Sequence, residues 1–257
     1  NPLSAIAILS LLAWGLGYFG QPHILARFKA IRSSDQIPQA RRIAVTWAGL
    51  GLAGATLVGM AGVSYFDTPL VDPEKVFIEL VNLLFHPLIA GILLAAILAA
   101  IMSTADSQLL VSSSTLTEDF YKTLLRPNAG SRELVLVGRC AVLLIALAAY
   151  GLALDTESTV LGLVSYAWAG FGAAFGPTLL LSLFWPRMTR NGALAGIVCG
   201  GLTVVIWKQL EGGLFELYEI LPGFLISLLA IVLVSLRGRP PGAEIDTEFR
   251  AVRQRLN

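Results

Sequence analysis

The sequence predicts an all-α protein that crosses a membrane several times. Hydrophobic residues make up 56% of the 257 residues and charged residues only 14%, whereas soluble domains carry about 25% charged residues. The mean hydropathy is +0.74. The charges are clustered, and most gaps between them reach the roughly 17–25 residues that a helix needs to cross the hydrocarbon core. We therefore expect seven spans, in the gaps 1–26, 43–66, 80–105, 140–154, 158–186, 191–207 and 220–236.

The basic residues support this count and give an orientation. Of the 18 lysine and arginine residues, 16 lie in the loops after the first, third, fifth and seventh expected spans. The other loops hold only Lys75 and Lys208, beside nine acidic residues. Because basic loops stay in the cytoplasm, we expect a multi-pass protein of the cytoplasmic (inner) membrane. Its chain would start outside and its C-terminus would be cytoplasmic.

The first span carries residues that weaken a helix. The stretch "GLGYFGQPH", residues 15–23, holds three glycines and a proline. Broken helices are tolerated in lipid only where the freed backbone groups meet a cavity or a ligand, and many secondary transporters use them at substrate sites. Trp14 and Tyr18, four residues apart, would then form a wall for a small, partly apolar solute, with Gln21 following the break. A kinked helix with an interfacial aromatic belt is the alternative.

Two later spans also contain proline. The apolar region around "VFIELVNLLFHPLIAG" is too long for one crossing, so we expect an outer-side helix that ends at His86-Pro87, and a span from about Ile89 to Leu116. The stretch "AGFGAAFGP" predicts a glycine-rich interruption in the fifth span. Residues 1–236 would form the transmembrane region. Residues 237–257, which are charged and rich in Pro and Gly, would form a cytoplasmic tail without membrane function.

The stretch "AAIMSTADSQLLVSSSTLTEDFY", residues 99–121, indicates an ion site. Ala100, Ser103, Thr104 and Ser107 share one helix face because they are spaced i, i+3, i+4 and i+7. Asp106 lies beside this face, and a charged carboxylate inside a span costs at least about 2.5–3.5 kcal/mol. Hydroxyl and carboxylate oxygens suit a hard monovalent cation, since they replace its lost water. Alternatively, the hydroxyls bond to carbonyls of their own helix or to a neighbouring helix.

The sequence excludes several other classes of function. It contains no nucleophile–base pair, zinc spacing or phosphate-binding glycine loop, so we expect neither an enzyme nor a bound cofactor. The net charge of +1 gives no indication of nucleic-acid binding, and we expect none. The expected partners are small solutes and the lipid bilayer.

Three stretches in order resemble the sodium/solute symporter family: "WGLGYFGQPHILARF", "AAIMSTADSQLLVSSSTLTEDFYK" and "VLGLVSYAWAGFGAAFGP". The resemblance runs from residue 3 to about 236, and "RNGALAG" and "YEILPGF" extend it through the last two spans. It implies a fold of five-plus-five inverted repeats with peripheral helices. This chain would be its second half, which comprises the second repeat and two peripheral helices. The missing N-terminal half of the same transporter would be a partner.

The resemblance also implies an activity, the sodium-coupled symport of L-proline into the cell by alternating access. Sodium would be the coupling ion, bound by the backbone carbonyl of Ala100 and the hydroxyls of Ser103 and Thr104. Our further hypothesis is that Asp106 and Ser107 supply or tune a second cation site. The alternative is that Asp106 pairs with a polar group on a neighbouring helix.

The proline pocket would be lined by four residues near the broken first span. Trp14 and Tyr18 would form its wall, Pro22 would shape its helix, and Gln21 is a further candidate. Two other functions stay open: a symporter for another small solute such as pantothenate or a different amino acid, and a membrane sensor module. A retinal protein is excluded, because it needs a lysine in its last span and residues 220–236 contain none.

Overall fold

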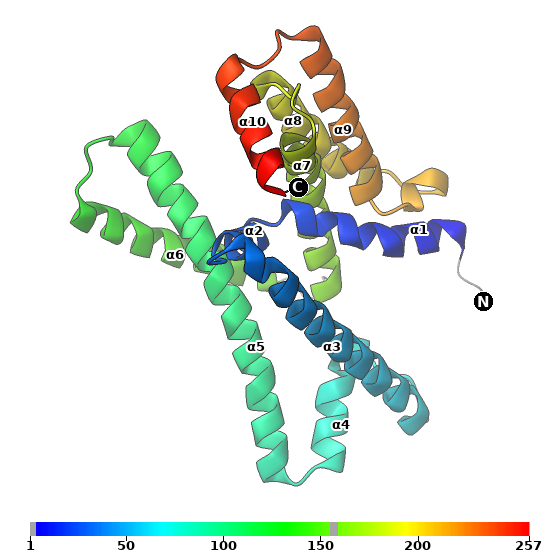
Figure 1. The fold of residues 1–257 in the computed structure, drawn as a ribbon. Coiled ribbons are helices and arrows are strands. Elements are labelled where there is room, and N and C mark those ends of the chain that lie inside the picture. The colour runs from blue at the N-terminus through cyan, green and yellow to red at the C-terminus, as the bar shows by residue number, and fades with distance from the viewer. Residues whose placement is uncertain (1–3, 155–158, 257) are drawn as a thin grey trace. The chain divides into compact units, whose positions relative to one another are not determined.

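The computed structural model describes residues 4–154 and 159–256, and every regular element in these ranges is a helix (Figure 1). In these ranges six helices are long and apolar enough to cross a membrane, and the bent helix pair near the N-terminus makes a seventh if it is taken as one span. These segments coincide with the seven expected spans, and the chain is an all-α polytopic membrane protein. It divides into two compact units, residues 1–28 with 151–257 and residues 29–150. Each unit is described by itself.

The first unit begins with the broken span that the sequence predicts. Helix α1 (Ala5–Ala13) starts at Ser4, whose hydroxyl accepts a hydrogen bond from the Ala7 amide, and passes directly into the 3₁₀ helix η1 (Trp14–Gly20). Helix α2 (Pro22–Lys29) follows at an angle of 55°. Proline is favoured at the first position of a helix, where its missing N–H leaves no bond unmade. The break prediction is therefore confirmed.

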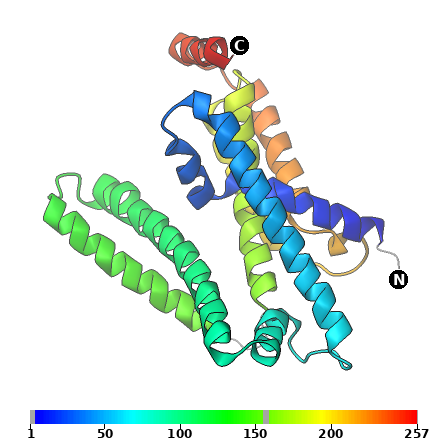
Figure 2. The same cartoon turned by 60° about the horizontal axis from the view of Figure 1, so that its bottom comes forward.

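The rest of this unit consists of α7 (Val160–Phe184), α8 (Arg190–Trp207), the 3₁₀ turn η5 (Gly213–Glu216), α9 (Ile220–Arg237) and α10 (Ala243–Leu256). The helices α7, α8 and α9 pack closely through small residues, as is usual in membrane bundles. Three buried glycines of α8 at every fourth position face buried side chains of α9; they are Gly192, Gly196 and Gly200. Figure 2 shows these helices side by side.

One expectation about this unit is wrong. Helix α7 runs without interruption through "AGFGAAFGP", and Pro177 lies inside it. Gly172 and Gly176 serve close packing instead, because a Cβ at Gly172 would lie 2.7 Å from the Gly17 Cα of η1 and one at Gly176 would lie 2.7 Å from the Phe224 ring. Pro177 cannot bond to the carbonyl of Ala173, and this carbonyl lies against Gly200 of α8. The neighbouring helix thus covers the backbone group that the proline frees.

The second unit contains a short 3₁₀ turn η2 (Ser34–Gln36), the long helix α3 (Ile37–Tyr65), the 3₁₀ turn η3 (Pro73–Lys75), α4 (Val76–Leu84) and α5 (Pro87–Ser114). The predicted stop at His86-Pro87 is confirmed. The imidazole Nδ1 of His86 accepts a hydrogen bond from the Leu88 amide and so caps α5.

The end of this span has a conformation that the sequence did not predict. Helix α5 continues as the π-helix η4 (Thr115–Leu125), and α6 (Ser131–Ala153) returns along it (Figure 2). The amide of Arg126 donates to the carbonyl of Tyr121, five residues earlier, as π geometry requires. The π-helix is rare and is frequently found at functional sites.

Candidate functional site

The predicted sodium ligands lie on α5, in the middle of an apolar helix. The Ser103 hydroxyl donates to the carbonyl of Ala100 at 2.9 Å, and the Thr104 hydroxyl donates to the same carbonyl at 3.2 Å. These are the own-helix bonds that the alternative interpretation expects, and they also bring oxygen atoms of three predicted site residues together at one point of the helix. Each hydroxyl keeps lone pairs that can face a cation, because donation uses only its hydrogen.

The two residues of the hypothetical second site lie next to this point. The Ser107 hydroxyl is 3.2 Å from the carbonyl of Ser103 and 2.9 Å from that of Thr104. Asp106 is exposed, and its carboxylate takes part in no ion pair within the described part of the chain. A carboxylate without an ion-pair partner among the described residues therefore lies beside the hydroxyl face.

The hydroxyl face of α5 is a partial ligand set. Ala100, Ser103, Thr104 and Asp106 are all exposed. A cation that has lost its water needs oxygen atoms on all sides, and one helix supplies them from one side only. The remaining ligands must come from another helix or from water.

The predicted substrate residues belong to an aromatic cluster in the first unit. Trp14 stacks on Trp168 of α7, with ring centroids 5.7 Å apart, and on Tyr218, which precedes α9, at 5.9 Å. Tyr18 meets Trp168 edge to face at 4.8 Å, and its side chain is 52% exposed. The two residues that the sequence placed together thus share Trp168 as a neighbour.

Side chains from α7 and η1 bond to each other's backbone at the break. The indole N–H of Trp168 donates to the carbonyl of Trp14 at 2.9 Å. The side-chain amide of Gln21, which is only 5% exposed, donates to the carbonyl of Trp168 at 3.3 Å. Gln21 is therefore a buried link between the broken span and α7, and Pro22 starts α2 directly after it.

Tyr218 fixes this cluster from the loop between α8 and α9. Its hydroxyl donates to the carbonyl of Ser165 at 2.7 Å, and its amide donates to the Ser10 hydroxyl at 2.9 Å. Burial, and the nearby Glu219 carboxylate, raise the pKa of the Tyr218 phenol well above its usual value. The phenol therefore stays protonated and keeps its hydrogen bond at physiological pH.

Trp168 and Tyr218 belong to the aromatic cluster around the predicted substrate residues, and the sequence did not predict them. Both lie in stretches that carry the family resemblance, "VLGLVSYAWAGFGAAFGP" and "YEILPGF". An aromatic side chain in a run of small residues was the available signal. The contact of Trp168 with Trp14, which lies 154 residues earlier, could not be predicted from the sequence.

Replacing Trp168 by phenylalanine is expected to destabilise the protein. The ring stacking is retained, but the half-buried carbonyl of Trp14 loses the indole donor, which costs about 0.5–1.5 kcal/mol. The measurement is the thermal unfolding midpoint of the purified protein in detergent. The control is Trp47→Phe, because Trp47 lies on α3 and is 79% exposed. Equal midpoints for the two variants would contradict the role of this bond.

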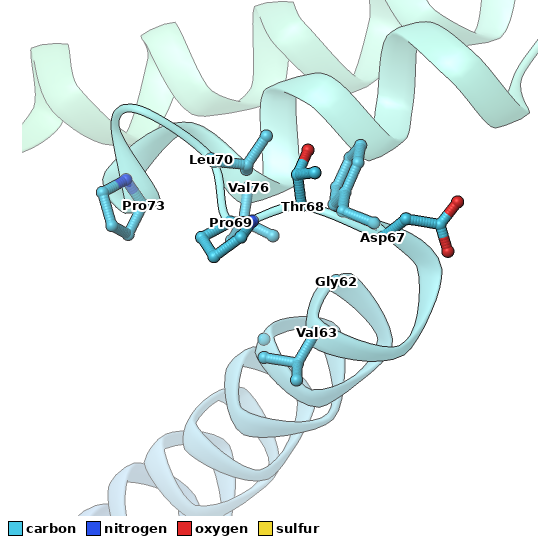
Figure 3. A pocket seen from close by; sticks show the side chains of 10 residues that line it. Gly62, Val63, Asp67, Thr68, Pro69, Leu70, Pro73 and Val76 are labelled. Carbon is cyan, nitrogen blue, oxygen red and sulfur yellow. The ribbon is translucent and has the colours of Figure 1, made fainter.

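A pocket of about 490 Å³ lies in the second unit, where α3 ends and turns toward α4 (Figure 3). Its lining is mostly apolar, with Val63 and Val76 among the side chains, and Asp67 is its one charged member. Figure 3 shows the Asp67 carboxylate turned away from Val63. None of the predicted site residues lines this pocket.

Comparison with known proteins gives the family. A family model described as the sodium:solute symporter family matches residues 2–200. The sodium/proline symporter of Escherichia coli (strain K12) is 58% identical over 254 residues, which are 96% of this chain and 50% of that protein. The high-affinity proline transporter of Bacillus subtilis (strain 168) is 54% identical over 250 residues, which are 96% of this chain and 52% of that protein.

A more distant relative matches over the same extent. The sodium/proline symporter of Staphylococcus aureus is 48% identical over 263 aligned positions, which cover 98% of this chain and 52% of that protein. The chain thus spans about half the length of the curated relatives it matches. The family match covers all four predicted substrate residues and all five predicted sodium ligands. This chain belongs to the sodium:solute symporter family.

Proposed function

We propose that this chain is the C-terminal half of a symporter that carries L-proline into the cell together with sodium. Its relatives at 58% and 54% identity are named a sodium/proline symporter and a high-affinity proline transporter. The observation that carries the proposal is the cluster of three oxygens at the Ala100 carbonyl, inside an apolar span of a chain of this family.

The missing N-terminal half would complete the fold. The first five spans of this chain would form the second of two inverted repeats, and the last two spans would be peripheral helices. Residues 237–257 would form the cytoplasmic tail. The half-length match to the relatives supports this division. A helix of the first repeat would face the hydroxyls of α5 and supply the ligands that α5 lacks.

Sodium binding would be the first step of transport. The ion would take a lone pair from the Ala100 carbonyl and from the Ser103 and Thr104 hydroxyls, and would hold α5 against the first repeat. This would stabilise an outward-open state and preform the proline site. Coupling is then the affinity that each ligand gains from the other, and it is necessarily reciprocal. The membrane potential adds about 2.3 kcal/mol per charge per 100 mV.

Proline would bind at the break in the first span. Its ring would lie against Trp14 and Tyr18, which the contact with Trp168 positions. Its carboxylate would lie near a half-helix N-terminus such as that of α2, where backbone N–H groups point toward an anion. Gln21 is buried and bonded to α7, so its role would be to position the break.

The orientation in the membrane follows from the distribution of basic residues. The loops after the first, third, fifth and seventh spans, together with the parts of the helices next to them, hold 16 of the 18 lysine and arginine residues. Under the positive-inside rule the chain therefore starts outside, and α10 lies in the cytoplasm. Release of proline and sodium into the cell would follow the rocking of one helix bundle against the other.

The experiment that tests this function is uptake of labelled proline into vesicles that contain the full-length transporter. We expect accumulation under an inward sodium gradient and none under an equal potassium gradient. Competition by pantothenate or by another amino acid would identify the alternative substrate class. The proposal fails if no tested solute accumulates with sodium, in which case a sensor module becomes the better interpretation.

Asp106→Asn tests the second cation site. If Asp106 and Ser107 bind or tune a second sodium ion, loss of the charge is expected to lower the number of sodium ions carried per proline, or to weaken the sodium dependence of uptake by about tenfold. The measurement is the ratio of labelled sodium to labelled proline taken up by the same vesicles. Asp67→Asn is the matched control, since Asp67 is an exposed loop residue of the same unit. Unchanged sodium dependence and stoichiometry would remove Asp106 from the mechanism.

A further inference from the structure

A groove of about 610 Å³ lies between the end of the third span and α6. One wall comes from α5 and η4, and the other comes from α6, so the groove belongs to the second unit alone. Figure 2 shows the two walls as neighbouring arms of one helical hairpin. None of the predicted sodium or proline residues lines this groove.

The groove exists because the two helices touch only at a few points. Gly138 of α6 faces Thr117 of η4, where a Cβ would lie 3.5 Å from the threonine hydroxyl. Nearer the loop, the Tyr121 hydroxyl donates to the Glu133 carboxylate at 2.6 Å, and Arg126 lies 3.6 Å from that carboxylate. The hairpin is thus closed at its loop and open beside the Thr117 contact.

The two ends of the groove differ in chemistry. Leu110 and Val142 form an apolar end, farther from the loop. Toward the loop the lining includes Ser131, Lys122 and Glu118, the last two joined by an ion pair of 2.8 Å. A molecule that fills the groove therefore needs an apolar part and a polar part.

Arg139 is the remaining charged residue of the lining, because Lys122 and Glu118 neutralise each other. It lines the groove, and no ion pair or hydrogen bond of its side chain occurs within residues 4–154 and 159–256. It lies eight residues into α6, about 12 Å along the helix axis. Side chains of a helix lean toward its N-terminus, so the long side chain of Arg139 can reach the polar end of the groove. Arg139 is exposed, so its guanidinium is accessible to an anionic ligand.

We propose that this groove binds the headgroup of an anionic phospholipid. The charged groups of the lining are Glu118, Lys122 and Arg139, so the site has a net charge of +1 and is matched by one phosphodiester or glycerophosphate charge. The planar guanidinium of Arg139 can hold two phosphate oxygens at once. One acyl chain lies along Leu110 and Val142. Basic pockets between membrane helices recognise lipid headgroups by this combination of charge and apolar surface.

The test is lipid retention by the purified full-length transporter, measured by native mass spectrometry with added phosphatidylglycerol or phosphatidylcholine. Wild-type protein is expected to retain phosphatidylglycerol preferentially. Arg139→Gln is expected to lower the apparent affinity for phosphatidylglycerol about tenfold, because it removes a charge-assisted bond, and to leave phosphatidylcholine unaffected. Arg139→Lys, which keeps the charge, is expected to restore part of the preference.

The matched control is Arg132→Gln, which removes one charge from the same helix outside the groove. Equal losses in the Arg132 and Arg139 variants would overturn the proposal, since they would show only a general charge effect. Displacement of the lipid by excess inorganic phosphate would also overturn it, because the site would then bind a soluble anion. If Arg139→Gln protein cannot be recovered, Lys122→Gln tests the opposite wall with the same expected loss. These results do not depend on proline transport.

Discussion

A transporter with alanine at both Ser103 and Thr104 is expected to lose sodium-driven proline uptake. The two hydroxyls supply two of the three oxygens that converge at the Ala100 carbonyl. Each bond to a charged group contributes about 1.5–3 kcal/mol. Because about 1.4 kcal/mol corresponds to a tenfold change in affinity, the double variant should bind sodium at least about a hundredfold more weakly. The measurement is the initial rate of uptake across a range of sodium concentrations.

The matched control is the double variant Thr56→Ala, Ser64→Ala. These two hydroxyls lie on α3 in the same unit, are exposed, and donate to carbonyls four residues earlier at 2.9 and 3.2 Å. Like Ser103 and Thr104, they donate to carbonyls of their own helix, but to two different carbonyls instead of one. Uptake in the control should match the wild type. A comparable loss in both double variants would show that the hydroxyls act only as packing groups.

Gly172→Ala is expected to have the second large effect, on stability rather than on sodium affinity. A Cβ at this position would lie 2.7 Å from the Cα of Gly17 and 2.8 Å from the Ile220 side chain. The backbone of η1 cannot move aside without disturbing the aromatic cluster that Trp14 forms with Trp168. Overpacking of this kind costs about 1–3 kcal/mol. We expect a lower thermal midpoint and less folded protein in the membrane.

Gly170→Ala is the control for this prediction. Gly170 lies two residues earlier on α7, and a Cβ there would meet no atom within 4 Å. Alanine is the better helix former by about 0.8–1.0 kcal/mol, so this variant should be as stable as the wild type or slightly more stable. If Gly172→Ala were as stable as Gly170→Ala, the close contact between η1 and α7 would be wrong.

The membrane spans could be predicted from the sequence because their signals are local. A long gap between charged residues is sufficient to place a helix in lipid, and the described helices agree with the expected gaps. The stop at His86-Pro87 was predictable for the same reason, since proline acts on its own turn. The break after Gly20 was indicated by composition alone.

The errors and omissions depend on contacts between distant segments. Pro177 resembles Pro22 in its glycine-rich setting, yet α7 stays continuous because α8 covers the freed carbonyl of Ala173. The π-helix of residues 115–125 could not be predicted, because the segment contains no proline or glycine that would indicate a change of helix type. The stacking of Trp14 with Trp168 and Tyr218 joins three segments that lie far apart in the sequence.

The part of the candidate sodium site that lies within one helix was predictable from the sequence. Helical spacing places Ala100, Ser103 and Thr104 on one face, and the structure adds that both hydroxyls meet one carbonyl. Any further ligands of a bound ion would lie outside α5, and no pattern within one helix can predict them.

Sodium binding itself tests the central claim most directly. Binding of labelled sodium to the purified full-length transporter is measured in the presence of proline. Three proteins are compared: the wild type, the double variant with alanine at Ser103 and Thr104, and the control with alanine at Thr56 and Ser64. The account predicts saturable binding in the wild type and the control, and none at the same sodium concentrations in the α5 variant. Saturable binding of equal affinity in all three proteins would contradict it.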